Sequence, residues 1–269
     1  MNVGIIGYGS MGKMLLEKFA ESGSICSDCL FVYNRNPEKL ADVATKYNVT
    51  SSSAELVSKC DIVFICVRPG DMKDVFENIK SSVKEGTLLV SLNGSITFDM
   101  LERIIPTSIA KVIPSVTAEI NKSQTLVCYN SKVCEREKQN LVSLLQMIGT
   151  VIELPEKELG MGSELVSCMP GFIAAIFDCL VSDARKHTSL SEAQIIDMVL
   201  NTLNATSDLM LSSNMSFGDV VTRVATKGGI TEEGTRVIYD GFPEICSDLF
   251  EKTLDKRNAT AKMTEKMFD

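Results

Sequence analysis

Three glycines near the start of the chain are spaced as in loops that bind the diphosphate of a dinucleotide. The segment Gly7-Tyr8-Gly9-Ser10-Met11-Gly12 fits the pattern G-x-G-x-x-G, after an apolar run and before a helical pattern. In that setting the first glycine permits a tight turn, the second lets backbone N–H groups approach a diphosphate, and the third lets helix and strand pack closely. The diphosphate would lie at the positive end of the helix. We therefore predict a dinucleotide site here; a plain glycine-rich turn is the alternative.

The residues after the second predicted strand indicate which dinucleotide binds. Enzymes that use NAD place an acidic residue here for the ribose hydroxyls, whereas this chain has Tyr33-Asn34-Arg35-Asn36 and no carboxylate. Arg35 can hold a 2′-phosphate through charge-assisted hydrogen bonds, with Asn34 donating beside it and Lys39 adding charge. We therefore expect NADP as the cofactor. A solvated surface arginine is the alternative interpretation of Arg35.

The elements that must position this loop alternate between strand and helix patterns through about residue 154. Short β-branched or apolar runs predict strands at residues 3–6, 30–33, 62–67, 87–91, 108–113 and 125–129, with a possible last one at 150–154. Helical spacing lies between them, at residues 11–22, 37–47, 72–83, 98–104 and 134–147. This alternation predicts an α/β fold, in which residues 1–155 form an N-terminal Rossmann domain with a doubly wound, mainly parallel sheet.

Residues 156–269 show no further strand pattern and predict an all-helical domain. We expect its helices to be interrupted at Pro170, Gly218, Gly228-Gly229 and Gly241. One predicted helix carries apolar side chains almost all round, which a thin domain of this size does not easily bury: Ile195, Ile196, Met198, Val199, Leu200 and Leu203. We therefore expect this domain to associate subunits into a homodimer or larger homo-oligomer. A central helix surrounded by its own chain is the alternative.

Length and charge limit the classes of partner. The 269 residues fit two domains at about 150 residues per domain, and the net charge of −8 argues against a nucleic-acid-binding protein. The longest uncharged apolar stretch, residues 165–177, contains Pro170 and is shorter than the roughly 18 residues of a spanning helix. The first residues lack the basic region of a signal peptide. We therefore expect a cytoplasmic protein that neither spans a membrane nor binds nucleic acid.

The cysteines and the histidine predict no metal site. The nine cysteines are odd in number and scattered, as expected for small apolar residues in a reducing compartment. Cys26 and Cys29 form one C-x-x-C, which cannot complete a four-ligand zinc site without a second pair. His187, the single histidine, lies at the polar end of a predicted helix, where a solvated or capping role is expected.

Later motifs resemble a known enzyme family along essentially the whole chain. Val67-Arg68-Pro69, Val112-Ile113-Pro114-Ser115-Val116-Thr117-Ala118 and Ala225-Thr226-Lys227-Gly228-Gly229-Ile230-Thr231 are similar, in order and spacing, to motifs of the pyrroline-5-carboxylate reductases. The resemblance implies a Rossmann domain followed by a helical domain that dimerises by interlocking. It also implies NADPH-dependent reduction of a cyclic imine carboxylate, 1-pyrroline-5-carboxylate or a close analogue, to L-proline, as in proline biosynthesis.

Site residues carry over from this family by resemblance. Cofactor contacts are implied for Ser53, where the family has an asparagine, for Asn93-Gly94 near the nicotinamide ribose, and for Cys66, Val67, Arg68 and Pro69 on the adenine-ribose side. The substrate end is implied to include Gly228, Gly229, Ile230 and Thr231, with Ser115 and Val116 in the earlier motif. Lys227, which replaces a family proline, is a hypothesis for a new carboxylate ligand. Thr231 would be the catalytic residue, donating its hydroxyl toward the ring nitrogen while backbone N–H groups at the helix start hold the carboxylate. A simple helix cap is the alternative role for Thr231.

The motifs also depart from those of the reductases. Ser115, Val116 and Thr117 replace N-T-P, Lys227 replaces the proline before the glycine pair, and Val166-Ser167-Cys168-Met169-Pro170-Gly171 keeps only the proline of S-G-S-G-P-A. The chain thereby resembles a divergent branch, the late-competence-operon proteins of bacteria. Its fold is therefore easier to assign than its reaction.

Three functions remain open from the sequence. The first is the NADPH-dependent imine reductase. The second is a dinucleotide-binding protein of the same family with an altered pocket and a regulatory or interaction role. The third, a β-hydroxyacid dehydrogenase, would need a lysine on the first long helix of the second domain, and residues 158–184 contain none.

Overall fold

The computed structural model describes residues 1–268, whose contacts divide into two compact units. The first unit is Met1–Pro170 together with the chain from Leu254, and the second unit is Gly171–Thr253. The chain therefore returns to its first unit at its end.

The first unit is built on one eight-stranded sheet with the order β3-β2-β1-β4-β5-β6-β7-β8. All neighbouring strands pair in parallel except β6 and β7, which are antiparallel. The prediction of a doubly wound, mainly parallel sheet is confirmed. The strands are β1 (Val3–Ile6), β2 (Leu30–Tyr33), β3 (Asn48–Val49), β4 (Ile62–Ile65), β5 (Leu88–Ser91), β6 (Ile109–Ile113), β7 (Ser123–Tyr129) and β8 (Gly149–Glu153).

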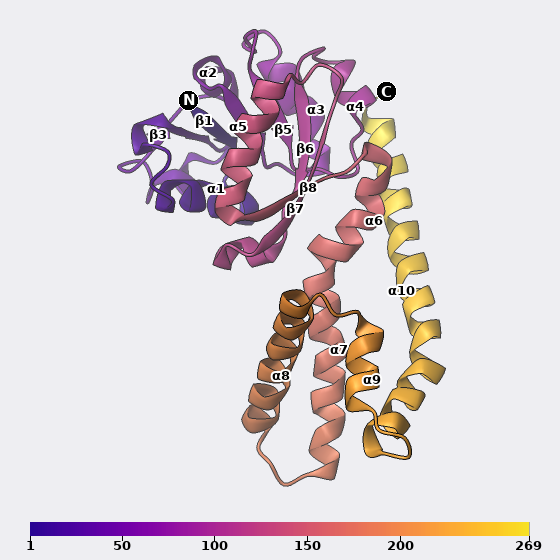
Figure 1. The fold of residues 1–269 in the computed structure, drawn as a ribbon. Helices are drawn as coiled ribbons and strands as arrows, with labels where there is room; N and C mark the ends of the chain where they lie inside the picture. The colour runs from indigo at the N-terminus through magenta and orange to yellow at the C-terminus, as the bar shows by residue number, and fades with distance from the viewer. Residues whose placement is uncertain (269) are drawn as a thin grey trace. The chain divides into compact units, whose positions relative to one another are not determined.

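Helices cover both faces of this sheet (Figure 1). On one face α1 (Ser10–Glu21) and α5 (Glu135–Leu145) pack on the side chains of Val3 and Ile5, and on the other α2 (Ser53–Lys59), α3 (Pro69–Ile79) and α4 (Phe98–Glu102) pack on Ile6. Successive strand residues point to opposite faces, so strands buried on both sides are apolar throughout. The sheet therefore holds the loop after β1 between two packed layers.

Two local predictions for this unit were wrong. Residues 37–47 form no α-helix: a 3₁₀ turn at Pro37–Leu40 is followed by further turns. Leu40 and Val43 are the only fully buried residues of this segment, with Tyr47 partly buried against the same core, which is little apolar contact to hold a helix there. The short edge strand β3 was missed, because two residues carry no readable alternation.

The rest of the chain is helical, as predicted. Its α-helices are α6 (Leu159–Ser163), α7 (Met169–Ala184), α8 (Glu192–Ser213), α9 (Phe217–Val224) and α10 (Ile230–Phe268), and a π-helical turn, η6, spans Glu164–Cys168. The remaining short 3₁₀ turns are η1 (Ser27–Cys29), η2 (Pro37–Leu40), η3 (Val116–Ile120), η4 (Gln146–Ile148), η5 (Glu156–Glu158) and η7 (Arg185–His187).

The predicted interruptions at Pro170 and Gly241 do not occur. Pro170 is the second residue of α7, and only Met169 separates it from the π-helical turn. The altered backbone hydrogen bonding there tolerates the loss of one N–H donor at proline. Gly241 lies inside α10, as does Pro243. A glycine lowers helix stability by about 1 kcal/mol, which does not end so long a helix. The break at Gly228-Gly229 is confirmed, and Gly218 lies in the first turn of α9.

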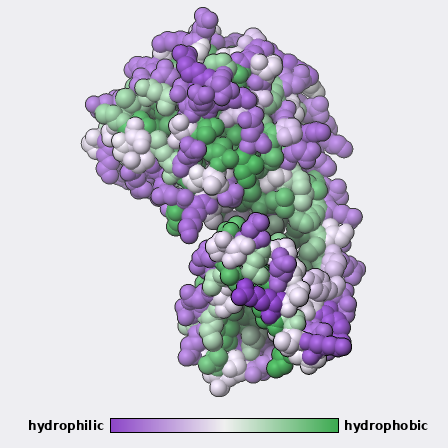
Figure 2. Space-filling view, viewed as in Figure 1, coloured by the Kyte–Doolittle hydropathy of each residue, from purple (hydrophilic) through white to green (hydrophobic). Residues whose placement is uncertain are grey.

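Apolar side chains gather on the surface of the second unit. Among its large apolar residues only Val181 and Ile195 are buried, whereas Leu211 and Phe217 are about four-fifths exposed. Figure 2 shows green, apolar side chains on the face of this unit that it presents. As expected, the helices of this unit leave much of their apolar surface unburied within the single chain.

The stretch Glu156–His187 is long and apolar enough to cross a membrane by length and composition, and little of it is buried. The uncharged apolar run in the sequence is shorter than this stretch, because it ends at Asp178 and contains Pro170. One such helix is weak evidence for a membrane span, since a helix that packs against another protein surface has the same composition.

Candidate functional site

The glycine loop after β1 has the geometry that its spacing predicts. Gly7 has a φ of +97°, and a Cβ there would lie 2.6 Å from the carbonyl oxygen of Cys66. A Cβ on Gly12 would lie 2.0 Å from the carbonyl oxygen of Gly7. A Cβ on Gly9 would meet nothing within 4 Å. The first and third glycines therefore permit close packing, while the second faces open space that a ligand can enter.

This loop is held in place by the residue that follows β2. The N–H of Gly7 donates to the carbonyl of Tyr33 at 2.8 Å, and the N–H of Tyr8 donates to Asn34 Oδ1 at 3.0 Å. Asn34 Nδ2 in turn donates to the carbonyl of Asn36 at 2.8 Å. Helix α1 then begins at Ser10 without a side-chain cap, so N–H groups of its first turn remain available for an anion.

A cavity of about 410 Å³ opens beside the loop. It brings together seven of the predicted cofactor residues, and positive side chains outnumber its single carboxylate. Its lining residues are Ile6, Gly7, Gly9, Tyr33, Asn34, Arg35, Asn36, Lys39, Cys66, Val67, Arg68, Asp71 and Val75. The remaining loop residues Ser10 and Met11 begin α1, and Pro69 begins α3.

Arg35 is not free in this cavity. Its Nη1 lies 3.0 Å from Asp71 Oδ1, in an ion pair whose arginine side chain is 86% exposed. Exposed pairs of this kind contribute little free energy, so a phosphate can displace the carboxylate. Asp71, in the first turn of α3, was not predicted as a site residue. Its signal in the sequence is a lone acidic residue two positions after Val67-Arg68-Pro69.

Two groups near the loop have raised pKa values. Burial raises the pKa of the Cys66 thiol and of the Tyr8 phenol, and the Tyr8 hydroxyl has no hydrogen-bond partner among residues 1–268. Both groups are therefore uncharged near neutral pH and add no charge to a site for an anion. Ser53, predicted from resemblance, is buried at the start of α2 and does not line the cavity.

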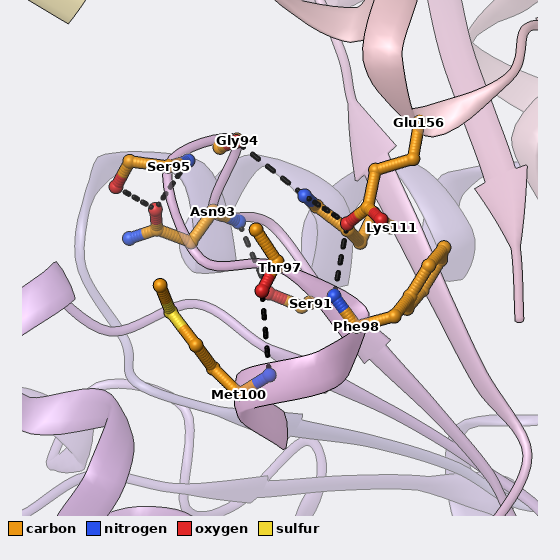
Figure 3. Close-up of polar contacts among 9 residues, drawn as sticks. All are labelled: Ser91, Asn93, Gly94, Ser95, Thr97, Phe98, Met100, Lys111 and Glu156. Atoms are coloured by element: carbon orange, nitrogen blue, oxygen red, sulfur yellow. Dashed lines mark hydrogen bonds and ion pairs between the residues drawn. The ribbon is translucent and has the colours of Figure 1, made fainter. Parts of the chain in front are cut away.

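Asn93 lies in the turn that follows β5, with its amide oxygen turned inward. Asn93 Oδ1 accepts from the N–H of Ser95 at 3.0 Å and from Ser95 Oγ at 2.7 Å (Figure 3). Its Nδ2 donates to none of the described residues. Since ligands of such sheets bind beyond the carboxyl ends of the strands, this amide can donate to a cofactor there.

The predicted substrate residues fall into both units. In the first unit Ser115 is buried, with its N–H donating to Ser123 Oγ at 3.0 Å, while Val116 is about half exposed. In the second unit Lys227, Gly228, Gly229, Ile230 and Thr231 form the turn before α10 and its first residues.

An acidic side chain already binds the glycine turn before α10. Gly228, with a φ of +72°, donates its N–H to Glu232 Oε2 at 2.6 Å. A carboxylate thus occupies the place where a substrate carboxylate is expected. Thr231 is the second residue of α10, so the alternative role of a simple N-cap does not hold for it. Lys227 and Gly228 are exposed, and Thr231 is partly buried.

His187 ends the 3₁₀ turn after α7. Its side chain is 76% exposed and its Nε2 lies 3.6 Å from Asp183. The solvated role that we expected for it agrees with this position.

Both halves of the chain match family models. A model described as "NADP oxidoreductase coenzyme F420-dependent" matches residues 2–94, and one described as "Pyrroline-5-carboxylate reductase dimerisation" matches residues 156–260. In the solved structures, the chain is similar to the crystal structure of Plasmodium falciparum pyrroline carboxylate reductase with NADP bound, with a TM-score of 0.84 at 22% identity over 100% of this chain and 98% of that one. This likeness shows the fold.

Two curated relatives from Bacillus subtilis (strain 168) extend over nearly the whole chain. Pyrroline-5-carboxylate reductase 3 is 34% identical over 257 residues, 94% of each chain, and ComE operon protein 4 is 28% identical over 271 residues, 100% of this chain and 99% of the relative. The Escherichia coli (strain K12) pyrroline-5-carboxylate reductase is 24% identical over 97% of this chain and 98% of the relative. With the glycine loop, the sheet and the helical region all in place, the chain belongs to the pyrroline-5-carboxylate reductase family.

Proposed function

We propose that this protein is an NADPH-dependent reductase of a cyclic imine carboxylate, 1-pyrroline-5-carboxylate or a close analogue, and forms L-proline. The observation that carries the proposal is the cavity beside the glycine loop, with Gly9 open to a ligand and Arg35, Lys39 and Arg68 around it. The 34% identity to a curated reductase supports the same reaction.

The residues of this cavity fit NADP. The uncapped start of α1 suits the diphosphate, and the cations after β2 suit the 2′-phosphate. When bound, the reduced cofactor supplies a hydride to the C=N carbon, and the ring nitrogen gains a proton. The protein has to bind and orient the substrate and the cofactor and exclude water. The reaction therefore demands little acid–base chemistry from side chains.

At the substrate end, we assign the hydrogen bond to the ring nitrogen to Thr231 and the carboxylate contact to the turn at Gly228-Gly229. Lys227, at the position of a family proline, would be a further carboxylate ligand, with Ile230 as a neighbour of the substrate. Ser115 and Val116, in the first unit, stay predictions from the resemblance. Replacing Lys227 by Ala is expected to raise the KM for the imine several-fold, about 1 kcal/mol. An unchanged KM in steady-state assays would remove Lys227 from the site.

We further propose that the protein is cytoplasmic and forms a homodimer or larger homo-oligomer. The match of residues 156–260 to a dimerisation family and the exposed apolar side chains of the second unit support association of identical subunits. The same association would cover the apolar stretch Glu156–His187.

An NADPH-oxidation assay with 1-pyrroline-5-carboxylate tests the proposal. We expect turnover that depends on both ligands, and tighter binding of NADPH than of NADH in calorimetric titrations. Absence of turnover by a protein that binds NADPH tightly would refute the reaction for this substrate. Equal affinities for the two coenzymes would contradict the role of Arg35.

A second candidate is a dinucleotide-binding member of this family that no longer reduces imines and acts through association. The hydrogen bond from the Gly228 N–H to the Glu232 carboxylate favours it, because this carboxylate competes with a substrate carboxylate. Replacing Glu232 by Gln distinguishes the two candidates. The reductase is expected to keep or improve its KM for the imine, whereas the second candidate shows no turnover in either form.

A further inference from the structure

A buried lysine in the first unit takes no part in the reaction proposed above. Lys111 lies in the middle of the apolar strand β6 and is about 1% exposed. Its Nζ lies 3.0 Å from Glu156 Oε1 and 3.4 Å from the carbonyl oxygen of Gly94, with the Phe98 ring centre at 5.7 Å. A buried ammonium group is tolerated only with such partners. A charged residue in a strand that is otherwise apolar was the sequence signal that we did not use.

The carboxylate of Glu156 joins this lysine to a third segment. Its Oε1 also accepts from the N–H of Phe98 at 2.9 Å, at the start of α4. The close-up shows these contacts converging from β6, from the turn after β5 and from the segment after β8 (Figure 3). One ion pair thus fixes segments that are 45 residues apart in sequence.

The turn held by this pair is the one that carries Asn93. The carbonyl of the next residue, Gly94, faces Lys111, while the Asn93 amide nitrogen points away from it (Figure 3). Two hydrogen bonds from Ser95 to Asn93 Oδ1 fix the amide in this orientation. Moving the Gly94 carbonyl would therefore also move the free amide donor of Asn93.

A second ion pair, with a buried carboxylate, lies close to the same turn. Arg257 of α10 donates from Nε and Nη2 to Glu164 Oε1, at 3.1 and 2.7 Å, and Glu164 is 2% exposed. Arg257 Nη1 would lie 3.6 Å from a Cβ on Gly94, and Ile113 Cδ1 3.1 Å from it. Both pairs are neutral overall, so they restrict the turn without adding net charge beside it.

We propose that Lys111 and Glu156 are positioning residues of the cofactor site, which fix the turn Asn93-Gly94-Ser95 so that the Asn93 amide donates to the nicotinamide half of NADPH. This inference rests on the proposed function, because it assumes that the cofactor extends past the ends of β5 and β6. It assigns no contact between Lys111 itself and a ligand.

The test compares two ligands on the full-length protein. NADPH occupies both halves of the site, whereas adenosine 2′,5′-bisphosphate occupies only the adenine half, beside the glycine loop. Replacing Lys111 by Met is expected to weaken NADPH binding about tenfold, the effect of one hydrogen bond of ordinary strength, and to leave binding of the bisphosphate within about twofold. Lys111→Arg keeps the charge and is expected to restore most of the NADPH affinity.

Lys138→Met is the matched control. Lys138 lies in the same unit and pairs with Glu153 at 3.1 Å, but its side chain is 31% exposed and it contacts no residue of the Asn93 turn. We expect it to bind both ligands as the wild type does. If Lys111→Met does not fold, Glu156→Gln, which keeps an acceptor for the Phe98 N–H but loses the charge, is titrated with the same two ligands.

Two results would overturn the proposal. One is an unchanged NADPH affinity in the Lys111 or Glu156 variant. The other is an equal loss of affinity for both ligands, which would indicate a purely structural role. The test is independent of turnover. A wild type that binds NADPH but reduces no imine would refute the proposed reaction and leave this ligand comparison valid.

Discussion

The first unit buries most of its large apolar side chains, whereas the second leaves many of its own at the surface. Of the buried apolar residues among the described part of the chain, only Val181 and Ile195 belong to the second unit. Exposed ones are frequent there, and Ile230 reaches 93%. The first unit therefore has a complete core within one chain, while the second needs a further surface to cover its helices.

The same difference separates the residues proposed for the cofactor from most of those proposed for the substrate. The glycine loop, the cavity and the Asn93 turn all lie in the first unit and are formed by one chain. The turn at Gly228-Gly229 and Thr231 lies in the second unit, where the helices are incompletely covered. We therefore expect dinucleotide binding to depend on the first unit, and imine reduction to depend on association as well.

Replacing Phe217 by Asp should have the largest effect. Its side chain is 80% exposed and borders an apolar groove with Met210, Ile238 and Tyr239. Aromatic residues at interfaces contribute about 2 kcal/mol or more, so we expect the dimer to weaken roughly 30-fold or more, with loss of turnover. Analytical ultracentrifugation measures the change. Val49→Asp, at the edge strand of the first unit, is the control; an unchanged dimer in the Phe217 variant would contradict the comparison.

A pair of glycine substitutions should separate packing from ligand binding within the first unit. Gly12→Ala places a Cβ 2.0 Å from the Gly7 carbonyl oxygen, and such overpacking lowers the free energy of unfolding by about 1–3 kcal/mol. Gly9→Ala meets nothing within 4 Å, so we expect stability close to wild type but weaker NADPH binding. Thermal unfolding and calorimetry measure the two effects. Equal losses of stability in both variants would show that the loop geometry is wrong.

Arg35→Gln should change the choice of cofactor. Hydrogen bonds to a charged group contribute about 1.5–3 kcal/mol, so NADPH affinity is expected to fall about tenfold to a hundredfold while NADH affinity stays nearly constant. Asp71→Asn should have a smaller effect of opposite sign, because it removes the carboxylate that pairs with Arg35. Titrations of both coenzymes measure the ratio. A parallel loss of NADPH and NADH would refute the 2′-phosphate contact.

The smallest effect concerns pH and the exposed surface of α2. Hydrogen bonds from Lys59, and then from Ser51, lower the pKa of Glu55 from 4.5 to about 2. Because the folded pKa is lowered, this stabilisation is present above pH 4.5 and is lost as the pH falls toward about 2. Glu55→Gln should therefore be less stable than wild type near neutral pH, with the difference shrinking on acidification. Urea unfolding across this range measures it, and a difference that does not vary with pH would exclude Glu55 as its cause.

The sequence predicted correctly those parts of the fold that depend on residues close together in the chain. The buried strands are runs of β-branched and apolar residues, and the glycine loop combines three local constraints in six residues, so both were predictable. The helix predicted at residues 37–47 is wrong, because apolar spacing does not show how few of these side chains are buried: Leu40 and Val43 fully, and Tyr47 in part. The predicted break at Pro170 is also wrong, because the π-helical turn before it has no sequence signature.

The site was predictable where it follows a motif and not where it depends on distant pairs. Gly7, Gly9 and Arg35 come from one end of the sheet that the strand order brings together. The ion pairs Lys111–Glu156 and Arg257–Glu164 join residues 45 and 93 apart, a separation over which spacing gives no information. The hydrogen bond from the Gly228 N–H to the Glu232 carboxylate could not be predicted either, because the sequence does not determine the direction of the Glu232 side chain.

A single turnover with NADPH carrying deuterium at the transferable position of C4 tests the central claim most directly. The wild type is mixed with 1-pyrroline-5-carboxylate and the product is examined by mass spectrometry. We predict proline that carries deuterium at the former imine carbon. A protein that binds the labelled cofactor but yields no labelled proline would contradict the assignment of this chain as an imine reductase acting on this substrate.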